Sequence, residues 1–205
     1  MKVPTQKTPA NVPEVTQAGL LSAAEREGKK ARGLPPVHLW NPDFCGDLDM
    51  RIARDGTWFY MGTPIGRERL VRLFSTILRH DEDGKYYLVT PVEKVGIKVD
   101  DAPFLAVAMK AEGEGREQVL TFTTSVGDDT VAGPEHPMRF VIDEESGEPA
   151  PYVHVRARLE ALINRAVFYD LVNLGVEEQH EGATWFGVWS SGVFFPFMLA
   201  ADMRF

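Results

Sequence analysis

Cysteine and long apolar runs are scarce in this 205-residue chain. The single cysteine, Cys45, excludes a framework of internal disulfides and a metal site built from cysteines alone, and it fits a reducing compartment. No apolar run approaches the roughly 20 residues that a membrane-spanning helix needs, and the N-terminus lacks the apolar core of a secretory signal. We therefore expect a soluble, cytoplasmic protein with no membrane span.

Recognised catalytic motifs are missing as well. The sequence contains no P-loop, no G-x-G-x-x-G and no G-x-S-x-G. His38, Asp43, Cys45, Asp47 and Asp49 crowd into a short stretch and offer ligand atoms that suit zinc or iron, but their spacing matches no metal motif. An enzyme that uses Cys45 or a metal is therefore only our third hypothesis, and we predict no catalytic residue, no metal ligand and no named cofactor.

Positively charged residues are outnumbered, and the net charge of the chain is −8. This charge argues against a general nucleic-acid binder, which needs a basic surface. The deficit is uneven along the chain. Residues 1–100 hold 15 Lys/Arg and 13 Asp/Glu, giving +2, whereas residues 101–205 hold 7 and 17, giving −10. The ordinary reading of the acidic second half is a solvated surface, so cationic groups for a ligand concentrate in the first half.

Residues 48–99 predict two hairpins around a helix. Leu48, Met50 and Ile52 alternate with less apolar residues, which gives a strand one apolar face. Asp55-Gly56 and Asp83-Gly84 predict tight turns, because glycine adopts positive φ without strain. Between the hairpins, apolar residues at helical spacing predict an amphipathic helix: Leu70, Leu73, Phe74, Ile77 and Leu78.

The segments before this pattern are less regular. Residues 1–15 predict a loose tail, and the capping-box spacing from Ser22 to Glu25 predicts a short surface helix that closes by residue 33. Residues 34–47 hold three prolines, so we expect a structured loop in which Trp40 and Phe44 pack onto the body. Such aromatic residues either anchor a loop or bind a ligand.

The second half predicts more strands and one long helix. Strands are expected in the 104–155 region, namely 104–111, 117–124, near 130, 136–142 and 151–155, and at 185–190 and 193–199. A helix is expected over about 156–174, with its apolar end buried and Gly175 as its stop.

Two sequence matches indicate an internal repeat. Met50-Arg51 matches Met138-Arg139 at an offset of 88, and RERLVRL from Arg67 matches RARLEAL from Arg156 at an offset of 89. Both blocks then read strand, strand, helix, strand, strand, for which duplication is economical, although any two amphipathic helices preceded by strands look alike. We predict an α+β fold with mainly antiparallel sheets: a tail and helix at 1–33, an N-terminal domain at 34–100, and a C-terminal domain at 101–205 that carries an inserted hairpin.

Arginines stand at the predicted start of both helices, where the helix dipole disfavours cations by a few tenths to about 1 kcal/mol. Arg67 and Arg156 are therefore suited to phosphate or carboxylate ligands, or they form ion pairs that hold the domains together. If the two halves meet face to face, Arg51 and Arg139 flank a shared cleft. The predicted ligand-binding residues are Trp40, Arg51, Arg67, Glu93, Lys94, Arg139 and Arg156.

Five segments carry a family resemblance. LWNPDFCGDLDMRI, DGTWFYMGTPIGRERLVRLFS, YYLVTPVEKV, DDAPF and GPEHPMRF resemble the bacterial family called domain of unknown function 1285. The resemblance implies two domains with a duplicated core, a C-terminal domain superficially like a pleckstrin-homology fold, and a ligand site at the domain junction. It also implies a nucleotide-like ligand and a role in signal transduction, but no chemistry.

Our leading hypothesis is therefore a protein that binds a small anionic, nucleotide-like ligand between its domains. The second is a protein-interaction module that presents a strand edge or an aromatic surface such as Trp185 and Trp189 to a partner chain.

Overall fold

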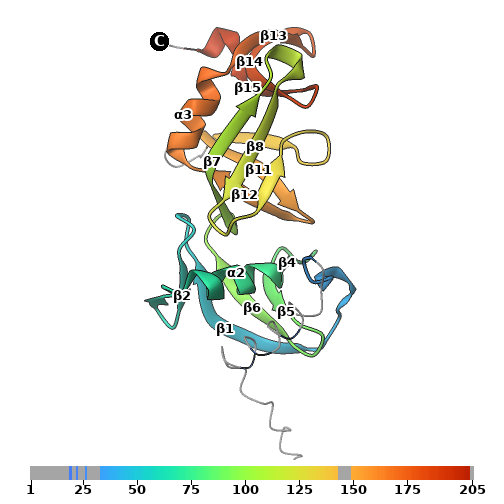
Figure 1. The fold of residues 1–205 in the computed structure, drawn as a ribbon, viewed down its shortest axis with the longest axis vertical. Coiled ribbons are helices and arrows are strands. Elements are labelled where there is room, and N and C mark those ends of the chain that lie inside the picture. Colours follow the sequence, from blue (N-terminus) through green and yellow to red (C-terminus); the bar gives the residue numbers. More distant parts are fainter. Residues whose placement is uncertain (1–18, 20–21, 23–25, 27–32, 143–148, 204–205) are drawn as a thin grey trace, which may run out of the picture.

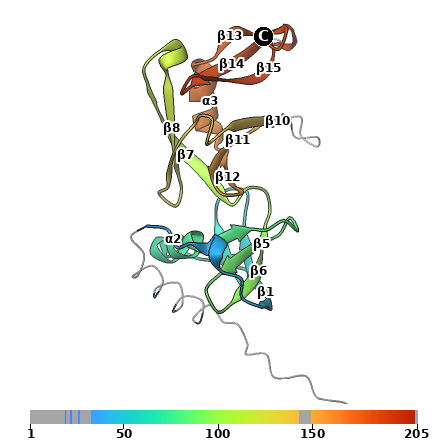
Figure 2. The same ribbon diagram turned by 90° about the vertical axis from the view of Figure 1, so that its right-hand side faces the viewer.

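A computed structural model describes residues 33–142 and 149–203, together with residues 19, 22 and 26. The predicted tail at 1–15 lies outside the described residues, and the predicted short helix lies mostly outside them. Two six-stranded sheets form two domains, one above the other in Figure 1, and a three-stranded sheet lies at the far end of the second domain (Figure 2). The fold is α+β with mainly antiparallel sheets.

The first domain contains both hairpins and the helix that the sequence predicts. Its strand order is β3-β2-β1-β6-β5-β4, and the central pair, β1 and β6, runs parallel whereas the other pairs are antiparallel. The elements, after the short helix η1 (Val37–Leu39), are β1 (Phe44–Ile52), β2 (Trp58–Tyr60), β3 (Thr63–Pro64), α2 (Glu68–Thr76), β4 (Leu78–His80), β5 (Tyr86–Val89) and β6 (Lys94–Val99).

Helix α2 covers one face of this sheet. Met50 and Ile52 of β1 are buried on that face, as their alternation predicts. Phe74 of α2 is fully buried and stacks on Trp58 of β2, with ring centroids 6.4 Å apart. The opposite face of β1 is left to polar side chains, and the candidate site described below lies there.

The loop before β1 differs from its prediction at one residue. Trp40 is partly buried against the core, as expected, and its carbonyl oxygen accepts a hydrogen bond from Arg79 at 2.6 Å. Phe44 is exposed, because it is the first residue of β1 and meets the ring of Tyr87 only edge-on. Its predicted burial is wrong.

The second domain has the strand order β10-β11-β12-β7-β8-β9, with β12 and β7 parallel, followed by the sheet β13-β14-β15. The strands predicted at 104–111, 117–124, near 130, 136–142, 151–155, 185–190 and 193–199 each overlap an observed strand, whereas β12 and β13 were not predicted. The elements are β7 (Phe104–Glu112), η2 (Gly115–Glu117), β8 (Val119–Thr124), β9 (Asp129–Val131), β10 (Met138–Ile142), β11 (Pro149–Arg156), β12 (Leu159–Ile163), α3 (Arg165–Asn173), β13 (Val176–His180), β14 (Ala183–Ser190), β15 (Val193–Leu199) and η3 (Ala200–Asp202).

The long helix predicted over 156–174 is wrong in its first half. Residues 159–163 form β12, which pairs with β11 on one side and β7 on the other, and its Leu159, Ala161 and Ile163 side chains are buried. The residues of this strand favour helices by propensity, and tertiary pairing overrides that preference. The helix begins only after Asn164, whose side chain caps it by accepting from the Val167 N–H at 2.8 Å.

The predicted repeat alignment is also wrong. Met50 lies on β1, which is central in its sheet, whereas Met138 lies on β10, which is at an edge. The residues matched to α2 form a strand hairpin. The two sheets nevertheless share one strand order when each is read from its own first strand, so β1 corresponds to β7 and β6 to β12. A duplicated core on that correspondence, like the pleckstrin-homology likeness, stays a prediction.

One contiguous apolar cluster runs through both domains and includes Trp58 and Phe74 from the first and Phe104 and Phe122 from the second. The domains are joined by residues 100–103, which lie between β6 and β7. In the described part of the chain, no helix combines the length and apolarity that crossing a membrane requires.

Candidate functional site

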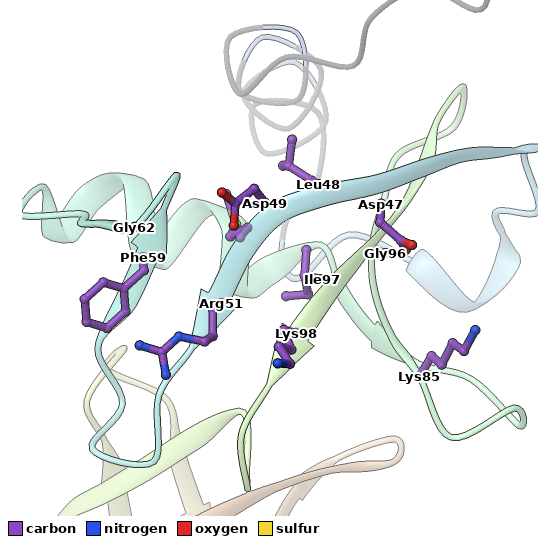
Figure 3. Close-up of a pocket in the computed structure, with 11 residues that line it drawn as sticks. Asp47, Leu48, Asp49, Arg51, Phe59, Gly62, Lys85, Gly96, Ile97 and Lys98 are labelled. Carbon is purple, nitrogen blue, oxygen red and sulfur yellow. The ribbon is translucent and has the colours of Figure 1, made fainter.

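A hollow of about 560 Å³ lies on the face of the first sheet opposite α2 (Figure 3). It is formed by β1, β2 and β6. Asp47, Asp49 and Arg51 line it because they alternate along β1 with the buried Met50 and Ile52 and so point away from the helix.

Arg51 is the central side chain of this hollow, and Figure 3 shows it between Phe59 and Lys98. Its guanidinium carbon lies 4.7 Å from the centre of the Phe59 ring. Lys98 is its direct partner in the parallel pairing of β1 and β6. Arg51 also donates to the carboxylate of Asp100 at 2.5 Å, so it connects the hollow to the first residue of the domain linker.

Gly96 lines the hollow beside Asp47. A Cβ atom at Gly96 would overlap the Asp47 carboxylate, so the absence of a side chain here makes room for that acid. Lys85 lines the hollow at the same end. The lining thus carries three cations and two acids, a local charge of +1 on a chain of net −8.

Asp81 organises the edge of the same sheet. It accepts from Arg79 Nε and from Lys94 Nζ, each at 2.6 Å. Burial by itself would raise the pKa of Asp81, but the hydrogen bonds from these two cations outweigh it and lower the pKa below 3.8. Because Arg79 also binds the carbonyl of Trp40, this network fixes two of the predicted site residues, Trp40 and Lys94.

A second polar network lies at the domain junction. The hydroxyl of Tyr152 donates to Asp101 at 2.8 Å, and Arg54 pairs with the same carboxylate at 3.1 Å. Burial and the hydrogen bond to Asp101 raise the pKa of Tyr152 to about 12. Arg139 lies over the Tyr152 ring at 3.9 Å and binds Glu160 through two nitrogens, and these hydrogen bonds raise its pKa.

The seven predicted site residues do not share one pocket. Arg51 and Arg139 both lie near the linker: Arg51 binds Asp100, and Arg139 lies over the ring of Tyr152, whose hydroxyl binds Asp101. Arg156 crosses the junction on another side, because it pairs with Asp128 and donates to the Ser75 carbonyl at the end of α2.

The remaining predicted residues lie elsewhere. Arg67 is the N-cap residue of α2 and lines a separate hollow beside Tyr60 and Leu70. Trp40 lines a groove of about 550 Å³ that also contacts Arg158 of the second domain. Glu93 lies in the turn between β5 and β6, where its N–H donates to Thr90 Oγ1 at 3.1 Å.

Sequence reasoning missed Phe59, Lys85 and Lys98. The alternation of β2 could have placed Phe59 opposite the buried Trp58. Lys98 could not be found in the same way, because it lies beside Arg51 only through the parallel pairing of β1 with β6, and the two residues are 98 − 51 = 47 positions apart in the sequence.

The third hypothesis, an enzyme that uses Cys45 or a metal, has no assembled metal site among the described residues. No group of three or more His, Cys, Asp or Glu side chains there could hold a metal ion. Cys45 is partly buried, and its sulfur contacts the carbonyl oxygen of Asp43 at 3.4 Å.

Comparison with known proteins places the chain in a family. Residues 35–102 match the N-terminal domain, and residues 103–197 the C-terminal domain, of the protein family of unknown function DUF1285. No curated protein matches the chain. The crystal structure of a DUF1285 family protein from Silicibacter pomeroyi DSS-3 is 61% identical, with a TM-score of 0.81 over 90% of this chain and 97% of that one. Another, from Shewanella baltica OS155, is 29% identical over 62% and 91%, with a TM-score of 0.48. The chain belongs to the DUF1285 family.

Proposed function

We propose that the hollow on the open face of the first sheet binds a small anionic ligand of nucleotide-like chemistry. The observation that carries the proposal is the grouping of Arg51, Lys85 and Lys98 around one cavity on an otherwise acidic protein. A local cationic lining attracts anions even when the net charge is negative. The volume of about 560 Å³ is within the range of small-molecule sites.

Phe59 supplies the second chemical requirement. A nucleotide presents a flat base as well as phosphates, and aromatic rings and guanidinium planes stack on bases. The Phe59 ring and the Arg51 guanidinium already lie 4.7 Å apart, so they form a prepared surface for a base beside the cations that would hold a phosphate.

The same arrangement suggests how a ligand would act as a signal. A phosphate that engages Arg51 competes with Asp100 for its guanidinium. Asp100 begins the linker, and the next residue, Asp101, is held by Tyr152 of the second domain. We extend the proposal to signal transduction on this basis, because ligand binding would change the contacts that fix the linker between the domains.

Calorimetric titration with a panel of nucleotides tests this function. We expect saturable binding of at least one nucleotide, and a loss of about 10-fold to 100-fold in affinity for Lys98→Ala, since a hydrogen bond to a charged group contributes about 1.5–3 kcal/mol. Lys110→Ala is the matched control, because Lys110 is an exposed strand lysine in the other domain that pairs with Glu112. Equal binding by both variants would reject the site, and no binding at millimolar nucleotide would reject the function.

A protein-interaction role is the second candidate. Strand β10 is at the edge of its sheet and exposes Val141 and Ile142, and an exposed apolar edge can pair with another strand. Trp189 contributes less than predicted to such a surface, because it lies beneath Arg116 and against Phe194. Capture of a defined partner that depends on Val141 would support this alternative.

A further inference from the structure

An apolar groove of about 660 Å³ lies between α3, β10 and β15 of the second domain, and we call it the α3 groove. Four phenylalanine rings form much of its wall. Phe197 is central, because its ring centroid lies 4.3 Å from Phe140, 5.6 Å from Phe186 and 6.3 Å from Phe168. This groove has no role in the anion site proposed above.

Several of the described residues that line the α3 groove are exposed. Ile142 on its rim is 55% exposed and Met198 is 36% exposed, and Tyr169 is also exposed. Large apolar side chains grouped around a concave surface are typical of a site for an apolar ligand, whereas single exposed apolar residues need no explanation. Asn173 and Asp202 also line this groove, so its wall is mostly but not entirely apolar.

A second hollow, of about 680 Å³, lies beside this groove. The two share Pro149, Phe168 and Tyr169. The second hollow extends to the N-terminus of α3 and to the turn after β1, where Arg165 and Arg54 line it. Together the two hollows lead from an aromatic wall to a cationic end.

The cationic end has a defined geometry. Arg165 is the first residue of α3, whose first turn contains no acid, and its Nε donates to the Tyr169 hydroxyl at 2.9 Å. The partial positive charge of the helix N-terminus adds to that of Arg165. Acids are present as well: Asp55 accepts from the Thr57 N–H at 2.9 Å, and Asp101 pairs with Arg54.

We propose that these adjacent hollows together bind a long-chain fatty carboxylate, with the alkyl chain in the α3 groove and the carboxylate at Arg165. The complementarity is twofold. The phenylalanine wall matches a flexible apolar chain, and the guanidinium at the start of α3 matches the single negative charge at the end of that chain. A shorter anion such as acetate gains only the second contact.

A chain-length series measures the apolar contribution. Calorimetric titration of the full chain with acetate, octanoate, decanoate and laurate, each below its micelle concentration, should give saturable binding of laurate. Affinity should rise by about fourfold for each added methylene, the factor that corresponds to burial of one CH₂. An affinity independent of chain length, or no saturable laurate binding, would overturn the proposal.

Two substitutions test where the alkyl chain and the carboxylate of laurate bind, and a third serves as a control. Met198→Glu places a charge in the groove and should weaken laurate binding at least 10-fold, whereas Val131→Glu should not, because Val131 is 43% exposed on β9 at the opposite edge of the sheet. Arg165→Ala should weaken laurate binding several-fold and leave dodecanol binding unchanged. Equal loss of laurate affinity in both glutamate variants, or equal effects of Arg165→Ala on laurate and dodecanol, would contradict the assignment.

Other occupants of the groove give different results. If the α3 groove docks on membranes, the protein will bind vesicles of phosphatidylglycerol and will not bind monomeric laurate. If a second copy of the chain covers it, light scattering will show a dimer that Met198→Glu dissociates. Either result in place of laurate binding would overturn the proposal.

Discussion

Replacement of Asp81 by asparagine should destabilise the protein through loss of one partly buried carboxylate. The Asp81 side chain is 20% exposed and binds Arg79 and Lys94 at 2.6 Å each. Hydrogen bonds to charged groups contribute about 1.5–3 kcal/mol each. Because an asparagine oxygen still accepts one weaker bond, we expect Asp81→Asn to lower the free energy of unfolding by about 2 kcal/mol at pH 7, measured by urea denaturation.

The pKa of Asp81 determines how the stability difference between the wild-type protein and Asp81→Asn should change with pH. The pKa of Asp81 is lower in the folded protein than its ordinary value of 3.8. Its carboxylate therefore stabilises the fold above pH 3.8, and that contribution is lost as the pH falls through the lowered pKa of the folded state. The stability difference between the wild-type protein and Asp81→Asn should narrow as the pH falls below 3.8.

Glu82→Gln is the control for this experiment. Glu82 is the next residue and pairs with Arg158 at 2.8 Å, but its side chain is 89% exposed. Exposed ion pairs contribute little, so this change should cost less than about 0.5 kcal/mol. Equal effects of the two substitutions, or a difference for Asp81→Asn that does not change with pH, would refute the reasoning from burial.

Three further predictions follow from particular contacts. Gly187→Ala should destabilise the protein by about 1–3 kcal/mol in thermal or urea unfolding, because a Cβ there would overlap the Phe195 carbonyl and the Phe194 ring, whereas Gly66→Ala meets nothing within 4 Å and should stay within about 0.5 kcal/mol. Tyr152→Phe should lower the free energy of unfolding by about 1 kcal/mol, because it removes the hydrogen bond to Asp101. In an ultraviolet titration, Tyr87 and Tyr152 should ionise at about pH 12, which is later than an ordinary tyrosine, and Tyr87→Phe and Tyr152→Phe should each remove one late transition. The stability that each raised pKa contributes is complete below pH 10 and is lost as the pH rises towards 12.

The sequence was sufficient for elements whose own pattern decides their structure. Alternation and Asp-Gly turns placed β1, β2 and β5, and the spacing of Leu70, Leu73 and Phe74 placed α2. It was insufficient where tertiary pairing decides. RARLEAL reads as a helix, but it forms the last residue of β11, a turn and most of β12, and β12 pairs with β11 and β7. Asparagine is a preferred N-cap residue, and Asn164 marks the true start of α3.

The candidate site was predictable only in part for the same reason. Arg51 was identified from its strand alternation, and its place in the hollow agrees with the face assigned to it. Its neighbours Phe59 and Lys98 come from the pairing of β1 with β2 and β6, which a single sequence does not encode locally. The arginines matched through the repeat, Arg139 and Arg156, were grouped with Arg51 on an alignment that the strand order contradicts.

Chemical-shift mapping of the ¹⁵N-labelled protein during titration with a nucleotide tests the central claim most directly. The account predicts that the largest saturable shifts fall on the backbone amides of Arg51, Phe59 and Lys98, with smaller shifts at Asp100 and Asp101. Shifts centred instead on Arg79 to Asp83 and Arg158, or an unchanged spectrum at millimolar nucleotide, would contradict it.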